Sequence, residues 1–386
     1  MDRLTETRDV LRDLIAFPTI SSDSNLEMIA YLATRLGDAG AHVELQQDES
    51  GKKANLFATL GPDTGGGILL SGHSDVVPVT DQDWSSDPFE MVEQDGLLFG
   101  RGSCDMKGFI AAAIAKAPDF AARELTRPLH LAFTYDEEVG CLGAQALCGW
   151  LRDREARPSV AIIGEPTSMA VIEGHKGCCE YTTHVHGLAG HGSVPGRGVN
   201  AVEYAVRYVT RLMEIAEALK ARAPRDSRFD PPWTTINTGA VIGGHAHNVI
   251  PETARVDWEF RPVQSSDFHF VKSEVEAHVR DVLLPAMRAV SPDAAITTEI
   301  IGEVIGLEPV QQNEARDIVM ALTGGNGADV VPFGTEAGLF GELGLSVVVC
   351  GPGSIEQAHK ADEYVAFDQL ASCLKMLGGL EERLVG

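Results

Sequence analysis

The sequence lacks an excess of positive charge and lacks any long apolar run. Its 386 residues contain 31 Lys and Arg against 56 Asp and Glu, which gives a formal net charge of −25 at pH 7. A chain this acidic is a poor partner for nucleic acids and for anionic membrane surfaces. No apolar stretch reaches the roughly 20 residues that a transmembrane helix needs. We therefore expect a protein that binds neither nucleic acid nor membrane.

Paired cysteines and a signal peptide are also missing. The seven cysteines are an odd number, and no C-x-x-C pair occurs among them. The beginning of the chain is acidic and places Leu4, Leu11, Leu14 and Ile15 on one face at helical spacing, which is not the pattern of a signal peptide. A reduced, cytoplasmic protein is the simplest prediction.

Internal repeats and low-complexity tracts are absent as well. The glycines at 65–67 are not followed by the Lys-Ser/Thr pair of a phosphate-binding loop. Hydrophobic residues make up 44% of the chain and charged residues 23%, which is ordinary for a globular protein. The length is sufficient for two or three domains.

The first part of the chain alternates between predicted helices and predicted strands. Helical periodicity covers residues 3–16, 24–39, 106–122 and 141–152. Short apolar runs predict strands near 42–47, 54–60, 67–72, 128–135 and 158–163. The same alternation of helices and strands returns late in the chain, with a helix at 313–323, a strand at 345–350 and a helix at 367–385. This α/β order predicts a mixed, mostly parallel sheet with helices on both faces.

The middle of the chain follows another pattern. Strands are predicted at 180–187, 234–242, 253–261 and 295–302, and helices at 200–222 and 267–290. Their order is βαββαβ, which is enough for a small α+β domain with two helices on one face of a sheet. We therefore predict a discontinuous first domain of residues 1–177 and 303–386, interrupted by an inserted domain of residues 178–302.

Residues of metal-ligand type follow four of the predicted strands and one further apolar run, Leu97-Leu98-Phe99, which is also typical of a strand. They are His73, Asp105, the pair Glu137 and Glu138, Glu165, and His359. Any one of them alone is more simply explained as a surface side chain or a helix cap. In an open α/β sheet, however, ligands gather outside the carboxyl ends of the strands. Two imidazoles and several carboxylates meeting there would suit two divalent cations.

Neighbouring residues suggest finer roles. Asp75 could accept the N–H of the His73 ring nitrogen that faces away from a metal, which would fix the ring tautomer. Of the adjacent Glu137 and Glu138, one could bind metal while the other takes a proton from water.

Taken together and in this order, the motifs resemble the di-zinc aminoacylase/carboxypeptidase-type metallohydrolases over nearly the whole chain. The matching segments are Ser-Gly-His-Ser-Asp-Val-Val-Pro (71–78), Gly-Arg-Gly-Ser-Cys-Asp-Met-Lys-Gly (100–108), Asp-Glu-Glu-Val-Gly (136–140), Gly-Glu-Pro-Thr (164–167) and the late His359. Within the family, segments 164–169, 173–181 and 334–338 look most like the members that deacetylate N-acetyl-L-ornithine in arginine biosynthesis. Glu165 agrees, since the family's desuccinylases tend to have Asp at this position.

The resemblance implies a set of metal ligands. Asp105 would bridge two divalent cations, which are expected to be zinc, with cobalt as an alternative. His73 and Glu165 would complete one site, and Glu138 and His359 would complete the other.

The resemblance also implies catalytic and substrate-binding roles. Glu137 would be the general base, and Asp75 would orient His73. The inserted domain would serve as a lid and dimerisation domain, in which His191 stabilises the oxyanion, often in the active site of a partner subunit. Asn248 and Arg261 would hold the carboxylate of the substrate, for which the two-pronged guanidinium is well suited.

One further residue and the exact reaction stay open. Glu336 is a candidate for binding the side-chain amine of the substrate or for a structural role. The expected reaction is hydrolysis of N-acetyl-L-ornithine, a small N-acyl amino acid, by a homodimer. The alternatives are a succinyl-diaminopimelate desuccinylase, a broad aminoacylase, a dipeptidase, or a non-catalytic metal-binding protein on the same scaffold.

Overall fold

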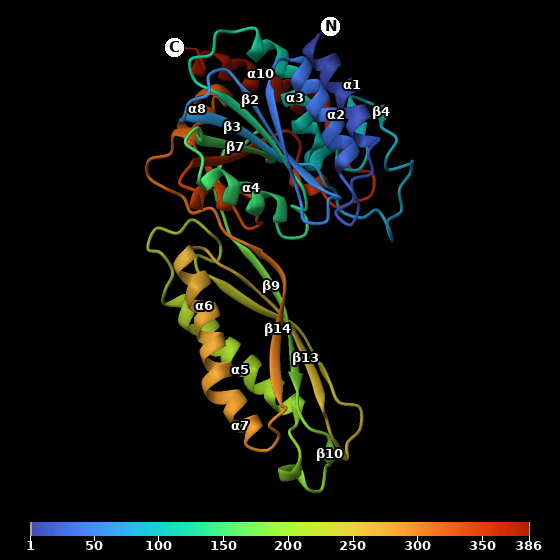
Figure 1. Ribbon diagram of the computed structural model, residues 1–386, viewed down its shortest axis with the longest axis vertical. Helices are drawn as coiled ribbons and strands as arrows, with labels where there is room; N and C mark the ends of the chain where they lie inside the picture. Colours follow the sequence, from blue (N-terminus) through green and yellow to red (C-terminus); the bar gives the residue numbers. More distant parts are fainter. Residues whose placement is uncertain (1, 386) are drawn as a thin grey trace. The chain divides into compact units, whose positions relative to one another are not determined.

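The chain folds into two compact units in this computed structural model, which describes residues 2–385. Unit 1 contains residues 2–174, 309–330 and 335–385, and unit 2 contains His175–Glu308 and Val331–Gly334 (Figure 1). The sequence analysis placed the inserted domain at 178–302, whereas unit 2 begins at His175, ends at Glu308 and also includes residues 331–334, which were assigned to the first domain.

Unit 1 is built on an eight-stranded mixed sheet. Its strand order is β1 (His42–Gln47), β2 (Ala54–Leu60), β6 (Leu129–Thr134), β3 (Gly67–His73), β7 (Pro158–Pro166), β16 (Ser346–Gly351), β8 (Ile172–His175) and β15 (Asp329–Val331). The four strands β6, β3, β7 and β16 pair in parallel, whereas β1 with β2, β2 with β6, and β8 with β16 pair antiparallel. The predicted mixed sheet is confirmed, with its parallel pairing confined to the centre.

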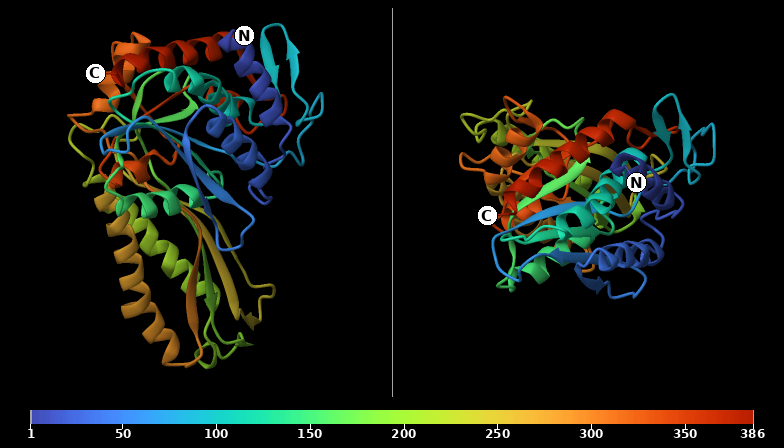
Figure 2. Two further views of the ribbon diagram at one scale, coloured as in Figure 1. Left: turned by 45° about the horizontal axis from the view of Figure 1, so that its top comes forward. Right: turned by 90° about the horizontal axis from the view of Figure 1, so that it is seen from above.

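Helices cover both faces of this sheet. One face carries α1 (Arg3–Ile15), α2 (Leu26–Asp38), α3 (Gly108–Ala121), α8 (Glu314–Thr323) and α10 (Phe367–Leu380), and the other carries α4 (Leu142–Arg152) and α9 (Ala337–Glu342) (Figure 2). Strand β3 is buried along its whole length. A central strand covered on both faces reads as a continuous apolar run, which is why the sequence pattern located it.

Several short elements were not predicted, although the apolar run at residues 97–99 was recognised as typical of a strand. Strands β4 (Val92–Gln94), β5 (Leu97–Phe99) and β17 (Tyr364–Ala366) form a small separate sheet, and the β4–β5 hairpin stands out from the rest of unit 1 in Figure 2. Strands β8 and β15 and helix α9 were missed as well. Elements of three to six residues contain too few side chains to show a hydrophobic period.

Unit 2 has a four-stranded antiparallel sheet with helices on one face. The strand order is β11 (Thr235–Gly243), β13 (Thr253–Arg261), β9 (Cys178–His186) and β14 (Ala295–Val304). Buried and more exposed residues alternate along β9 and β13. This alternation is typical of a sheet with only one covered face, and it explains why the βαββαβ order could be predicted.

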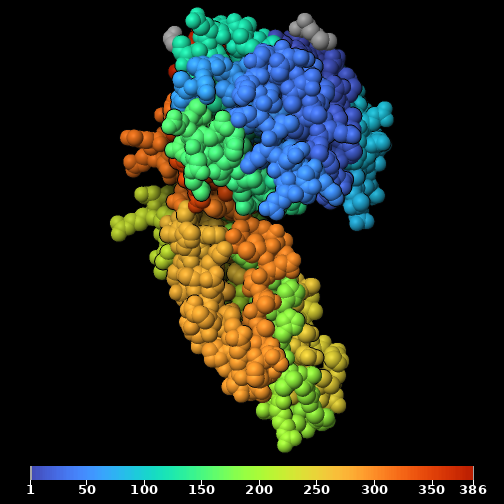
Figure 3. Space-filling model, viewed as in Figure 1, coloured from blue at the N-terminus to red at the C-terminus, as the bar shows by residue number. Residues whose placement is uncertain are grey.

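The helices of unit 2 differ from the prediction at one point. Helix α5 (Ala201–Lys220) is continuous, but the helix predicted at 267–290 is divided into α6 (Ser265–His278), a five-residue π-type turn η3 (Val279–Leu283) and α7 (Leu284–Arg288). Pro285 has no N–H to continue the regular hydrogen-bond ladder, and this explains the interruption. In Figure 3, α6 and α7 follow one another end to end on the visible face of unit 2, and β14 lies beside α7.

Among residues 2–385, no helix combines the length and the apolar character needed to cross a bilayer.

Candidate metal centre

The ligand-type residues of unit 1 meet at the carboxyl ends of the central strands. His73 is the last residue of β3, and Glu165 lies near the end of the parallel neighbour β7. Glu137 and Glu138 follow β6, and His359 follows β16. Because β3, β6, β7 and β16 run in the same direction, all these side chains start from one edge of the sheet.

Asp105 lies between the two imidazoles. It belongs to the turn η1 (Ser103–Lys107) before α3, where the backbone leaves helical geometry. Its Oδ1 lies 3.0 Å from His73 Nε2, and its Oδ2 lies 3.4 Å from His359 Nε2. The carboxylate is buried, with only 7% of the side chain exposed. A carboxylate whose two oxygens face two different imidazoles has the arrangement needed to bridge two cations.

Glu165 lies next to His73, on the side of Asp105 that faces this imidazole. Its Oε1 lies 3.8 Å from His73 Nε2. The same oxygen is buried and has no hydrogen-bond partner among the described residues. A buried acceptor without a donor costs about 1–3 kcal/mol or more when charged. A cation at this place would remove that cost, so the residues present fit a metal site.

Glu138 and His359 extend the group on the other side. Glu138 Oε2 lies 3.0 Å from His359 Nε2. His359 has a φ of +62°, in the left-handed region that residues other than glycine seldom adopt. Such a conformation persists only where surrounding contacts hold it, and it is most common at functional sites.

Two overlapping sets of ligand atoms could each hold a cation. One set is His73, Asp105 and Glu138, and the other is His73, Glu137 and Glu165; within each set the atoms lie within 4.8 Å of one another. Glu137 is therefore as close to the group as the residues predicted to be ligands. Geometry alone does not separate a ligand from a general base at this position.

The electrostatics of the site also favour bound cations. Burial raises the pKa of Glu137, Glu138 and Glu165, because a charged carboxylate is costly away from water. The pKa of His359 rises to about 10, mainly through its hydrogen bonds with Asp105 and Glu138. Four carboxylates that are buried or half-buried within one small volume need positive charge nearby to remain ionised, and divalent cations would provide it.

The predicted partner of His73 contacts it mainly through the backbone. His73 Nδ1 lies 2.9 Å from the main-chain oxygen of Asp75 but 3.6 Å from its carboxylate Oδ1. The Asp75 carboxylate instead accepts the main-chain N–H groups of Glu137 at 3.1 Å and Glu138 at 3.3 Å, together with the Ser21 hydroxyl at 2.7 Å. The Asp75 carbonyl thus favours a proton on Nδ1, which leaves Nε2 free for a metal, while its side chain holds the Glu137–Glu138 turn.

Glu336 lies behind the site. It precedes α9 and is fully buried. Its Oε1 accepts a hydrogen from the Ser71 hydroxyl at 2.5 Å, and its Oε2 accepts one from the Thr134 hydroxyl at 2.8 Å. These two partners come from the ends of β3 and β6, next to the predicted ligands. Of the two roles left open for Glu336, the structural one suits this burial better.

Two of the predicted lid residues lie together in unit 2. Strand β10 (Gly190–His191) pairs with β12 (Val249–Ile250), so His191 and Asn248 are close, and Asn248 O accepts the N–H of Gly192. His191 is exposed, and its Nδ1 accepts the main-chain N–H of Ser193 at 3.2 Å. The Ser193 hydroxyl also lies 2.8 Å from Nδ1; when Nδ1 accepts from both groups of Ser193, the ring proton is on Nε2, where it can be donated to another molecule.

Arg261 lies at the opposite end of unit 2. It is the last residue of β13, whose first residue is close to β12, and its guanidinium pairs with Glu259. Eight residue steps along an extended strand span roughly 26 Å. The structure therefore does not bring Arg261 together with His191 and Asn248 within one copy of unit 2.

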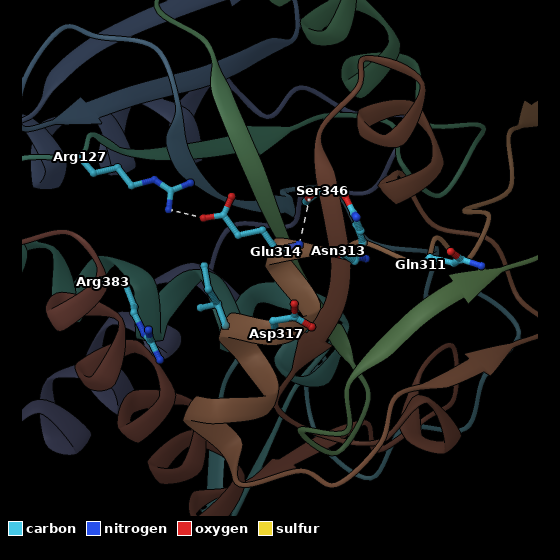
Figure 4. A pocket seen from close by; sticks show the side chains of 9 residues that line it. Arg127, Gln311, Asn313, Glu314, Asp317, Ser346 and Arg383 are labelled. Atoms are coloured by element: carbon cyan, nitrogen blue, oxygen red, sulfur yellow. Dashed lines mark hydrogen bonds and ion pairs between the residues drawn. The ribbon is translucent and has the colours of Figure 1, made fainter.

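A separate groove of about 790 Å³ lies away from these residues (Figure 4). It is lined by Arg127, Gln311, Gln312, Asn313, Glu314, Asp317, Ile318, Ser346 and Arg383. Ser346 begins β16, so the groove lies at the amino end of the parallel strands, at the opposite edge of the sheet from His73. Arg127 pairs with Glu314 at 2.7 Å inside it. None of the predicted site residues lines this groove.

Some supporting residues were missed by sequence reasoning. They are Ser21, Ser71, Gln82, Arg101, Thr134 and Glu363, which make long-range hydrogen bonds to predicted site residues, to their main chain or to one another. Ser71 and Arg101 lie within the matching segments 71–78 and 100–108, but neither is a residue of metal-ligand type. For Glu363, the local signal was its position four residues after His359.

Comparisons with known proteins agree with one another. The description of peptidase family M20/M25/M40 matches residues 69–382. The chain is 37% identical to an acetylornithine deacetylase of Myxococcus xanthus over 97% of both chains, and 35% identical to one of Shigella sonnei over 92% of both. Its fold resembles an M20 family metallo-carboxypeptidase from Sulfolobus solfataricus, with a TM-score of 0.74 and 17% identity over 99% of both chains. The YXEP protein of Bacillus subtilis, described as a dinuclear metal-binding peptidase, has a TM-score of 0.64 at 15% identity, over 99% of this chain and 98% of that one.

Proposed function

The chain belongs to peptidase family M20/M25/M40 and is a metallo-amidohydrolase, and from this premise we propose that it hydrolyses N-acetyl-L-ornithine to L-ornithine and acetate. For the substrate, support comes from the two acetylornithine deacetylases, which align over nearly the full length of the chain. For the chemistry, the observation that carries the proposal is Asp105, placed between His73 and His359 with Glu137 beside them.

The metal centre that we propose contains two divalent cations, zinc or alternatively cobalt. Asp105 would bridge them, His73 and Glu165 would hold one, and Glu138 and His359 would hold the other. These nitrogen and oxygen donors suit either metal. When bound, such cations polarise the acyl carbonyl and make a water molecule more acidic.

The side chains of the protein would then move the proton and hold the substrate. Glu137 would take a proton from the attacking water and return it to the leaving amine. Asp75 holds the main chain of Glu137, which keeps the base in position. The Nε2–H of His191 would donate to the oxyanion, and Asn248 and Arg261 would bind the carboxylate of the substrate.

The active unit would be a homodimer in which His191 acts on the partner's substrate. Arg261 and His191 lie at opposite ends of a nine-residue strand in one copy, too far apart to contact one small substrate. A second copy of the chain could place its own His191 next to the substrate that Arg261 binds. Exposed apolar side chains of unit 2 that could form an interface include Val206 and Met213 on α5 and Ile242 on the edge strand β11.

Mixing two inactive variants would test this arrangement. We expect His191→Ala and Glu137→Gln to be nearly inactive alone. After subunit exchange, half of the dimers would be mixed and each would contain one intact site, so about a quarter of the wild-type activity should return. Activity that stays at the level of the separate variants would show that His191 does not act across subunits.

A cytoplasmic location is part of the proposal. All seven cysteines are free of disulfides in the structure. Unpaired cysteines in this number suit a reducing compartment.

The substrate is tested with chelated protein that is re-supplied with zinc or cobalt. We expect metal-dependent release of acetate, fastest with N-acetyl-L-ornithine. N-acetylmethionine, N-succinyl-diaminopimelate and a dipeptide serve as competing substrates. Faster turnover of one of these would keep the metal chemistry but replace the substrate, and bound metal without any turnover would favour a non-catalytic role.

A further inference from the structure

The carboxylate of Glu363 is one of the most completely hydrogen-bonded groups near the metal centre. Its Oε2 accepts the N–H of Gly102 at 3.0 Å and a guanidinium hydrogen of Arg101 at 2.7 Å. Its Oε1 accepts the N–H groups of Cys104 at 2.9 Å and Asp105 at 3.0 Å. A carboxylate offers about four acceptor positions, and here all four are filled although the side chain is only 1% exposed.

These bonds hold the part of the chain from which Asp105 projects. The turn η1 departs from regular helical geometry at Asp105, so the main-chain N–H groups around it depend on a partner outside the helix. Glu363 provides that partner for three of them. A second link joins the same two segments, since the N–H of Gly100 donates to Glu363 O at 2.9 Å. The position of the Asp105 backbone is therefore set by Glu363.

A chain of hydrogen bonds also connects Glu363 to His359. Arg101, which pairs with Glu363, donates from Nη2 to Gln82 Oε1 at 2.5 Å. Gln82 Nε2 in turn donates to the main-chain oxygen of His359 at 3.0 Å. Trp84 lies under the Arg101 guanidinium, with 5.0 Å between its ring centroid and the guanidinium carbon. These contacts help to hold His359 in its uncommon left-handed conformation.

We propose that Glu363, acting with Arg101 and Gln82, is a positioning residue that sets the distance between Asp105 and His359. Since Asp105 and His359 would bind the same cation, Glu363, Arg101 and Gln82 would together influence the affinity of the protein for that cation. Among the described residues, no hydrogen bond or ion pair joins Glu363 to a ligand side chain, so its effect passes through the backbone of Asp105 and through Arg101. The inference rests on the proposed function, because it takes Asp105 and His359 as metal ligands.

The test is a cobalt titration of the metal-free protein, followed by the visible spectrum of bound cobalt. Glu363→Gln keeps the shape of the side chain but replaces one acceptor oxygen with a donor, so it loses two of the four bonds and the charge. We expect the weaker of two cobalt ions to bind about 10–100-fold less tightly, with an altered spectrum. In the same variant kcat should fall by a similar factor while KM changes little.

A second variant and a matched control separate positioning from general loss of stability. Gln82→Ala removes the link to His359 and the acceptor of Arg101 Nη2 and Trp84 Nε1, but it removes none of the four donors to Glu363. We expect it to weaken binding of the same cobalt ion by about 10-fold. Asp267→Asn in unit 2 removes another buried carboxylate that pairs with an arginine, Arg222 at 2.7 Å. This control should leave cobalt affinity and spectrum unchanged.

The outcomes that overturn the inference differ from those that overturn the proposed function. Unchanged cobalt affinity and spectrum in both Glu363→Gln and Gln82→Ala would overturn the positioning role, as would equal changes in Asp267→Asn. A wild-type protein that binds fewer than two cobalt ions would overturn the metal centre itself and the inference with it. If the wild type binds two cobalt ions but hydrolyses no N-acyl amino acid, the proposed reaction is wrong but the metal centre stands, and the cobalt comparison still decides the role of Glu363.

Discussion

Replacing Glu137 with glutamine is expected to lower kcat by about 10³-fold while the protein keeps both metals. Glutamine has nearly the same shape, but it cannot take a proton from water at neutral pH. Burial raises the pKa of Glu137, and a raised carboxyl pKa suits a group that both accepts a proton and returns it. The measurement is kcat on N-acetyl-L-ornithine together with the metal content of the purified variant.

The metal content decides between two roles for Glu137. Its carboxylate lies in one set of potential ligand atoms with His73 and Glu165, so loss of one metal in the variant would identify a ligand and would contradict the role of general base. Asp136→Asn is a matched control in the same turn, because Asp136 pairs with Lys53 at 2.5 Å. We expect the control to change kcat by less than about 10-fold.

Replacing Asp105 with asparagine is expected to lower the affinity for each of the two metals by more than about 100-fold and to abolish activity. Loss of a residue that only supports a ligand typically costs 10–100-fold in metal affinity, and Asp105 is proposed to bind both cations directly. Its two oxygens face His73 and His359, and asparagine leaves only one oxygen for the two positions. The measurement is metal stoichiometry and affinity after chelation and titration with zinc or cobalt.

The number of metals lost tests the bridging role. If Asp105→Asn loses one metal and keeps the other at wild-type affinity, Asp105 is a ligand of a single site. Cys104→Ser is a matched control from the same turn, since the Cys104 thiol contacts the carbonyl of Ser354 at 3.3 Å. A hydroxyl can replace the thiol in this contact, so the control should keep both metals.

The sequence located most of the fold because the signals are local. The continuous apolar run of β3 and the alternation along β9 and β13 report directly which faces are covered. Short elements such as α9 and strand β4 were missed, since their few residues show no period. The helix predicted at 267–290 is interrupted because one proline changed the hydrogen bonding within an otherwise regular pattern.

The candidate site was predictable as a list of residues but not as an arrangement. His73, Glu165 and His359 could be predicted as ligands because each follows a predicted strand, and parallel strands end at one edge of the sheet. The sequence suggested that the Asp75 side chain would face His73, whereas the backbone of Asp75 is closer. A difference of this kind depends on the direction of a side chain in a turn, which a spacing pattern does not contain.

The sequence by itself determined the inventory of ligands, their order along the chain and the α/β framework that carries them. Only the tertiary structure decided which oxygen of Asp105 faces which imidazole, how deeply Glu336 is buried, and that Glu363 holds the turn of Asp105. The physical reason is the range of these contacts. Asp105 and Glu363 are 258 residues apart, and no local periodicity reports a hydrogen bond that forms only after the strands between them have paired.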